Sequence, residues 1–335
     1  MAIIDVHTHA YTREYLELLR TKGGVYGLKR RPDGQEEIFR GATPVALPQP
    51  GHLDYDLRIR QMDENHIDAA IVSLTCPNCY WGGEEISAEV ARQSNDSMAA
   101  AQRKYPGRIY WYTSLPWEYP KRALEELRRT VDNGASGVMV LANVQGRSLT
   151  DPLFSPVWQA IDELRLPVLV HPTDLPGADR MDMGQYDLSW SVGFMADTTL
   201  AFARMIFDGF LDRYPNLKLI ASHGGGTLPY LIGRFDKGDE VELPSRRRIK
   251  ARPSAYLKRI WYDSICYSPE ALNYLIRIVG IERVLYGTDY PHQVHDMAGM
   301  FAKTETMPPD QRHAIRAGNA TRLFHLQGSA TADFG

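Results

Sequence analysis

Short apolar runs alternate with longer amphipathic segments along most of the chain. The short runs are nearly continuous in Val, Ile, Leu and Tyr, which is typical of strands buried on both faces of a parallel sheet. The strand candidates are Ile3–His7, Ala69–Leu74, Ile109–Leu115, Gly137–Leu141, Pro167–His171, Lys218–Ser222, Ile260–Asp263 and Val284–Gly287. The clearest helical patterns between them are Tyr119–Asn133, Pro156–Leu164, Asp197–Phe210 and Pro269–Val279.

Each of the eight strand candidates is followed by a helix or by a long excursion. This order predicts an α/β fold, a (β/α)₈ TIM barrel of the metal-dependent hydrolase type. A doubly wound sheet is the alternative, but it would need a nucleotide-binding loop, and none appears early in the chain. The glycines and prolines of Gly23–Tyr55 indicate an insertion after the first strand that covers the barrel mouth. We therefore expect one barrel domain over 1–326, with the insertion at about 23–55, and a disordered tail at 327–335.

The composition is that of a soluble globular protein, with 44% hydrophobic and 24% charged residues in a chain of 335. A net charge of −3 argues against nucleic-acid and membrane-surface partners, which favour a clustered basic face. No stretch approaches the ~18 apolar residues of a membrane span. The N-terminus lacks the basic-then-apolar form of a signal peptide.

Three cysteines are too few for a disulfide framework, and their odd number fits a reducing compartment. We therefore expect a cytoplasmic protein. Cys76 and Cys79 have C-x-x-C spacing, so a redox or zinc role has to be weighed. No second such pair completes a zinc site, and the pair follows a strand candidate. A loop at the strand end is the preferred interpretation.

Metal-ligand residue types stand at the ends of four strand candidates, where a barrel places its active site. His7 and His9 are two residues apart, so a strand points both imidazoles to one face. His171, His223 and Asp289 follow later strands. Alone, the histidines could be satisfied core residues and Asp289 a helix N-cap. Four of the ten histidines at strand ends instead predict a metal site.

His223 precedes three glycines, which let the backbone turn sharply and approach a ligand closely. This setting favours a general base that takes a proton from a metal-bound water. A further histidine ligand is the alternative. The other histidines are interpreted as surface residues or as residues behind the ligands; they are His52, His66, His292, His295, His313 and His325.

The chain resembles the amidohydrolase superfamily and, within it, the branch of aminocarboxymuconate-semialdehyde decarboxylase. The resemblance covers about residues 3 to 326. The motifs that carry it are Asp5-Val6-His7-Thr8-His9, Val170-His171-Pro172, Ser222-His223-Gly224-Gly225-Gly226, Gly287-Thr288-Asp289-Tyr290-Pro291, Pro253-Ser254-Ala255-Tyr256 and Gly318-Asn319-Ala320.

The resemblance implies one zinc ion held by His7, His9, His171 and Asp289, with a metal-bound water activated by His223. Two-metal members of the superfamily need a bridging carboxylated lysine at a strand end. No strand end here offers a lysine, which favours one metal. Three histidines and an aspartate would also accept Mn²⁺, Fe²⁺ or Co²⁺.

The resemblance also implies two arginines that hold the substrate carboxylate, one of them contributed across a dimer interface. The matching positions are Arg40, after the first strand, and Arg234, in the helix after the glycine run. Arginine suits the task because its planar fork pairs both carboxylate oxygens, although either residue could instead form a surface ion pair. Trp190 is expected to fill one wall of the substrate site. The carboxylates of 173–187 depart from the apolar loop of the resembled enzyme and indicate a different substrate.

The expected function is metal-dependent, non-oxidative decarboxylation of a small unsaturated or aromatic carboxylic acid by a homodimer or higher homo-oligomer. The alternative is a metal-dependent hydrolase of an amide, lactone or ester that uses the same metal-bound water. A barrel without activity is a third reading. It predicts an eroded site, whereas every ligand position here is filled.

Overall fold

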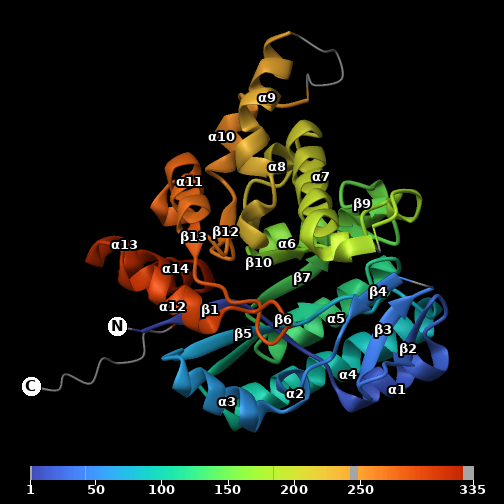
Figure 1. Cartoon of the computed structure of the whole chain (residues 1–335). Coiled ribbons are helices and arrows are strands. Elements are labelled where there is room, and N and C mark those ends of the chain that lie inside the picture. The colour runs from blue at the N-terminus through green and yellow to red at the C-terminus, as the bar shows by residue number, and fades with distance from the viewer. Residues whose placement is uncertain (1, 42, 184, 242–247, 327–335) are drawn as a thin grey trace, which may run out of the picture.

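Eight parallel strands, hydrogen-bonded in chain order, form the centre of the molecule (Figure 1). The computed structural model describes residues 2–326 except 42, 184 and 242–247. The strands are β1 (Ile4–Ala10), β5 (Ala69–Leu74), β6 (Ile109–Ser114), β7 (Gly137–Leu141), β10 (Pro167–His171), β11 (Lys218–Ala221), β12 (Trp261–Asp263) and β13 (Val284–Leu285). The eight strand candidates all lie at these positions, with ends that differ by three residues at most.

The first and last strands meet, which closes the sheet into a barrel. The backbone N–H of Val6 donates to Tyr286 O at 2.9 Å, and that of Asp289 donates to His7 O at 3.0 Å. An isolated parallel bridge joins Thr8 to Tyr290. The predicted (β/α)₈ barrel is therefore confirmed. Closure brings the histidines of β1 beside the segment that follows β13.

Helices surround the barrel, as Figure 1 shows. They are α1 (Arg13–Lys22), α2 (Pro50–Leu53), α3 (Tyr55–Glu64), α4 (Gly83–Lys104), α5 (Pro120–Asp132), α6 (Ser155–Leu164), α7 (Phe194–Phe207), α8 (Phe210–Arg213), α9 (Leu228–Glu240), α10 (Pro253–Leu257), α11 (Pro269–Val279), α12 (Met297–Glu305), α13 (Pro309–His313) and α14 (Asn319–Phe324). None of the helices in the described part of the chain is both long and apolar enough to cross a membrane.

Helix α11 shows why the helical patterns could be located from sequence. The Ser268 side chain caps its start by accepting the N–H of Ala271, and Pro269 occupies the first turn. Gly280, with a φ of 94°, ends it. Leu272, Leu275 and Val279 form its buried face. Both predicted ends match.

The segment after β1 carries a small antiparallel sheet of its own. Its strands are β2 (Tyr26–Arg30), β3 (Glu36–Arg40) and β4 (Thr43–Ala46). Ile38 is fully buried and packs into the main core. Residues of β4 reach the cavity above the barrel. The expected disordered tail at 327–335 lies outside the described residues.

The candidate metal centre

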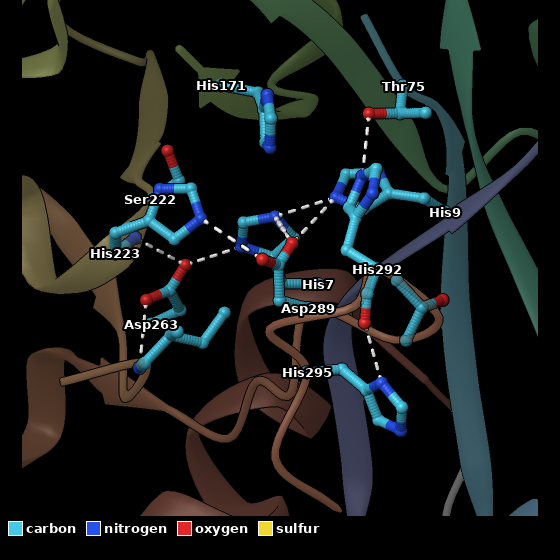
Figure 2. A network of polar contacts seen from close by, with 12 residues as sticks. His7, His9, Thr75, His171, Ser222, His223, Asp263, Asp289, His292 and His295 are labelled. Carbon is cyan, nitrogen blue, oxygen red and sulfur yellow. Dashed lines mark hydrogen bonds and ion pairs between the residues drawn. The ribbon is translucent and has the colours of Figure 1, made fainter. Parts of the chain in front are cut away.

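His7 and His9 project from the fully buried β1 to the same side of the strand (Figure 2). Their Nε2 atoms lie 3.0 Å apart. A hydrogen bond between these two Nε2 atoms would require one of them to carry a proton. Whether one does depends on the Nδ1 atoms, because a neutral imidazole that is protonated on Nδ1 has no proton on Nε2.

Both Nδ1 atoms are held as donors. His7 Nδ1 lies 2.6 Å from the Asp263 carboxylate, and His9 Nδ1 lies 2.9 Å from Ser73 Oγ. The Ser73 hydroxyl donates to Thr8 O at 3.1 Å, so its oxygen accepts the hydrogen bond from His9 Nδ1–H. In the neutral imidazoles the two Nε2 atoms therefore present lone pairs to each other. A cation between them removes this repulsion.

His171 adds a third lone pair from the end of β10. Its Nδ1 donates to Pro172 O at 2.8 Å, which leaves Nε2 unprotonated. That Nε2 is buried and has no hydrogen-bond partner among the described residues. The ring centre lies 5.1 Å from that of His7 and 4.8 Å from that of His9. Burial lowers the pKa of His9 and of His171 well below the usual range, so both stay neutral, as ligands must.

Asp289 supplies a carboxylate to the same point. Its Oδ1 lies 3.2 Å from His9 Nε2 and 3.5 Å from His7 Nε2. Burial acts to raise the pKa of Asp289, but its interactions with the neighbouring rings of His223 and His9 outweigh burial and hold the pKa well below the usual range. The group is therefore ionised at neutral pH.

The four predicted ligands thus form a donor set that fits one divalent cation. Three imidazole nitrogens and one carboxylate meet, with contacts of 3.0–3.5 Å between His7, His9 and Asp289. Candidate ligand atoms of His7, His171, His223 and Asp289 all lie within 4.8 Å of one another. Such a mixture of nitrogen and oxygen ligands suits Zn²⁺ and several other divalent metals.

His223 stands at the edge of the centre, on a turn with left-handed backbone. Its φ is 53°, and its Nε2 lies 3.6 Å from Asp289 Oδ2. Asp263 accepts the backbone N–H groups of His223 and Gly224 at 2.9 and 3.0 Å. The turn then passes Gly226, where a Cβ would lie 2.4 Å from Met195 O. Glycine is therefore required there for the chain to pass α7.

A cavity of about 750 Å³ opens above the centre. His171, His223 and Asp289 line it, and its lining is mostly apolar. The predicted wall residue Trp190 lines it and is 47% exposed. Other apolar lining residues include Val45, Leu47, Phe194, Met195, Ile265 and Leu275. This lining suits a flat apolar body whose polar end reaches the metal site.

The two predicted arginines do not line this cavity. Arg40 Nη1 pairs with Asp174 Oδ2 at 3.2 Å and lines a neighbouring cavity of about 870 Å³. Pro44 and Ser189 line both cavities, so the two adjoin. Arg234 is exposed on α9. Among the described residues, Arg31 is the arginine that lines the metal-site cavity, and its Nη1 lies 3.6 Å from Glu37 Oε1.

Sequence reasoning overlooked three residues that support the centre. Asp263 ends a predicted strand, so its position at the barrel mouth was a usable signal. Ser73 lies inside a predicted strand and carries no signal of its own. His292 was grouped with surface residues or residues behind the ligands, yet it lines the cavity and packs 4.8 Å from the His9 ring.

The surroundings of the C-x-x-C pair are those of buried structural cysteines. Cys76 and Cys79 are buried as free thiols, and Cys79 Sγ donates to Leu115 O at 3.3 Å. Burial raises the pKa of Cys76 to about 12 and also raises that of Cys79. Thiols with such pKa values are poor nucleophiles at neutral pH.

Comparison with known proteins places the chain in a family. The Amidohydrolase family model matches residues 4–326. The chain is 32% identical to 2-amino-3-carboxymuconate-6-semialdehyde decarboxylase of Dictyostelium discoideum, over 99% of this chain and 90% of the relative. It is 30% identical to gamma-resorcylate decarboxylase of Rhizobium sp., over 82% of this chain and 88% of the relative.

A similar solved structure is the 5-carboxyvanillate decarboxylase of Novosphingobium aromaticivorans, complexed with manganese and a nitrobenzoic acid. The TM-score is 0.83 at 25% identity, covering 97% of this chain and 96% of that one. The family match over nearly the whole barrel agrees with the ligand set at its mouth. The chain belongs to the amidohydrolase family.

Proposed function

We propose that this protein is a metal-dependent, non-oxidative decarboxylase of an unsaturated or aromatic carboxylic acid. The observation that carries the proposal is the donor set of His7, His9, His171 and Asp289 at the floor of a largely apolar cavity. The similarity to decarboxylases of muconate and benzoate derivatives supports it.

The residues divide the chemistry between them. A bound divalent ion supplies Lewis-acid polarisation of the substrate's oxygen atoms. The apolar walls, including Trp190 and Phe194, hold the ring. When the bond between ring and carboxylate breaks, the electron pair stays on carbon and carbon dioxide leaves. His223 Nε2 transfers the proton that this carbon then requires.

Within this proposal the cofactor is one Zn²⁺ ion held by His7, His9, His171 and Asp289. The nitrogen-rich donor set supports zinc. Manganese, named with the neighbouring decarboxylase, is the competing choice. Metal analysis of the purified protein distinguishes the two, and reconstitution of the chelated protein shows which ion restores turnover.

His223→Ala tests the reaction. We expect this variant to keep its metal and to lose turnover by about 100-fold or more, the usual contribution of a general acid or base. Metal content and bicarbonate release are measured for wild type and variant. Loss of the metal would show that His223 is a ligand. Cleavage of an amide, lactone or ester into two fragments, without bicarbonate, would favour the hydrolase alternative.

We also propose that the protein is a homodimer in which Arg234 binds the carboxylate in the partner's site, while Arg40 acts in its own chain. Exposed apolar side chains near the mouth support association: Tyr230 is 77% and Val192 52% exposed.

Mixing subunits tests the role of Arg234. Arg234→Ala and His223→Ala should each be impaired alone, and mixed dimers should regain part of the activity. Each mixed dimer then holds one site with both residues intact. Light scattering measures the assembly, and Arg277→Ala on α11 serves as a surface control. A monomer, or no recovery on mixing, would contradict this arrangement.

A further inference from the structure

His292 is positioned by the turn that follows Asp289. Its backbone N–H donates to Asp289 O at 3.0 Å, and its carbonyl lies 2.6 Å from His295 Nδ1. Figure 2 shows the ring beside His9, on the side of Asp289 away from His223. His292 and His223 therefore lie on opposite sides of the metal centre.

The rings of His9 and His292 each contact a hydroxyl group, through Nδ1 in His9 and through Nε2 in His292. Thr75 Oγ1 lies 3.1 Å from His292 Nε2, and Ser73 Oγ lies 2.9 Å from His9 Nδ1. Ser73 is the second-last residue of β5 and Thr75 follows the strand directly, so the two hydroxyls face the same side. One strand end thus supplies a hydroxyl to each of the two histidines.

The other ring nitrogen remains available to a molecule in the cavity. His292 lines the cavity, and its Nδ1 has no hydrogen-bond partner in the described part of the chain. A ring nitrogen of His292 lies within 4.8 Å of candidate ligand atoms of His9 and Asp289. The Thr75 hydroxyl has a second acceptor in Cys76 Sγ at 3.9 Å, but His292 Nε2 at 3.1 Å is much nearer. With the hydroxyl donating to Nε2, the neutral ring carries its proton on Nδ1 and can donate it.

We propose that His292 contacts the substrate and donates a hydrogen bond from Nδ1 to an anionic oxygen of the bound acid, its carboxylate or an adjacent hydroxyl. This inference rests on the proposed function for the class of ligand. It assigns His223 and His292 to opposite flanks of one acid: His223 moves the proton and His292 holds an oxygen. Positioning of this kind fixes the scissile bond relative to His223.

Two substitutions separate the hydrogen bond from the shape of the ring. His292→Phe keeps a ring without a donor, whereas His292→Asn places an amide donor near the position of Nδ1. The probes are 2-nitroresorcinol and 4-hydroxy-3-methoxy-5-nitrobenzoic acid, titrated calorimetrically into Mn²⁺-loaded protein. Metal content is measured for each variant. His313→Phe, at an exposed histidine on α13, is the matched control.

We expect His292→Phe to weaken binding of at least one probe by about tenfold, as loss of a hydrogen bond to a charged group does. His292→Asn should regain most of the affinity, and metal content should match wild type throughout. Unchanged binding in His292→Phe, or equal losses in both variants, would overturn the inference. Loss of metal would instead make His292 a ligand.

The outcomes also separate this inference from the proposed function. A wild-type protein that decarboxylates aromatic acids while His292→Phe binds normally would overturn the role of His292 alone. A wild-type protein that neither binds the probes nor decarboxylates any acid would overturn both.

Discussion

At the scale of single residues, the centre depends on which ring nitrogen carries the proton. Asp263, Ser73 and the Pro172 carbonyl each accept a hydrogen bond from the Nδ1–H of one histidine. All three Nε2 atoms are thereby left as bases that point at one place. Asp263 also accepts two N–H groups of the His223 turn, so one carboxylate supports a ligand and the proton-transfer residue together.

Asp263→Asn tests this double support. Burial acts to raise the pKa of Asp263, but its hydrogen bond from His7 outweighs it and keeps the group ionised. We expect metal affinity to fall by about 10- to 100-fold, because the amide no longer fixes the His7 tautomer. Competition with a chelator gives the affinity, and Asp132→Asn, exposed at the end of α5, is the control. Wild-type affinity would contradict the support role.

At the scale of elements, the turn after β11 decides where His223 stands. The chain leaves the barrel strand, turns through three glycines with positive φ and enters α9. A Cβ on Gly225 would approach the Tyr262 ring within 2.8 Å, and one on Gly226 would approach backbone of α7. The close approach of α7 and β12 therefore requires this glycine run.

Gly226→Ala and Gly233→Ala form a matched pair that tests the turn. Gly226 combines a φ of 62° with a Cβ position 2.4 Å from Met195 O, so alanine there should cost about 1–3 kcal/mol of unfolding free energy. Gly233 lies within α9 with open space around its Cβ position, so alanine should stabilise by about 0.5–1 kcal/mol. Urea denaturation measures both. Similar effects at the two sites would refute the steric argument.

At the scale of the whole molecule, the centre joins parts of the chain that are far apart in sequence. His7 and His9 come from β1, His171 from β10 and Asp289 from the segment after β13. A cation bound by all of them connects the two strands at which the barrel closes with the opposite side of its mouth. The metal should therefore contribute to the stability of the barrel as well as to turnover.

Removing the metal tests this coupling. An ion at ~100 times its Kd stabilises the fold that binds it by about 2.7 kcal/mol. We expect chelated protein to lose turnover and to unfold at a lower temperature, with both restored by Zn²⁺ or Mn²⁺. Scanning calorimetry with and without chelator gives the shift. An unchanged unfolding temperature, once metal analysis confirms removal, would show that the ligands do not stabilise the barrel through the ion.

Much of the architecture could be predicted from sequence because a parallel strand that is buried on both faces is a short, nearly continuous run of apolar residues. The strand Ala69–Leu74 and the helix Pro269–Val279 have the bounds that were predicted. The residue types at the strand ends then predicted the metal site, because the carboxyl ends of all barrel strands lie at the same mouth. That rule gave His7, His9, His171, His223 and Asp289 as candidates at the mouth, and the family resemblance singled out four of them as ligands.

Only the tertiary structure decided the contacts that loops make and the contacts between residues distant in sequence. Ser73 and Thr75 look like ordinary strand residues until barrel closure places His9 and His292 beside them. Arg40 pairs with Asp174, which no local pattern could indicate, because side-chain pairing depends on where two loops meet. The sequence by itself determined the barrel and the ligand types. The folded chain decided which histidine nitrogens carry protons, and thus where a metal and an acid can bind.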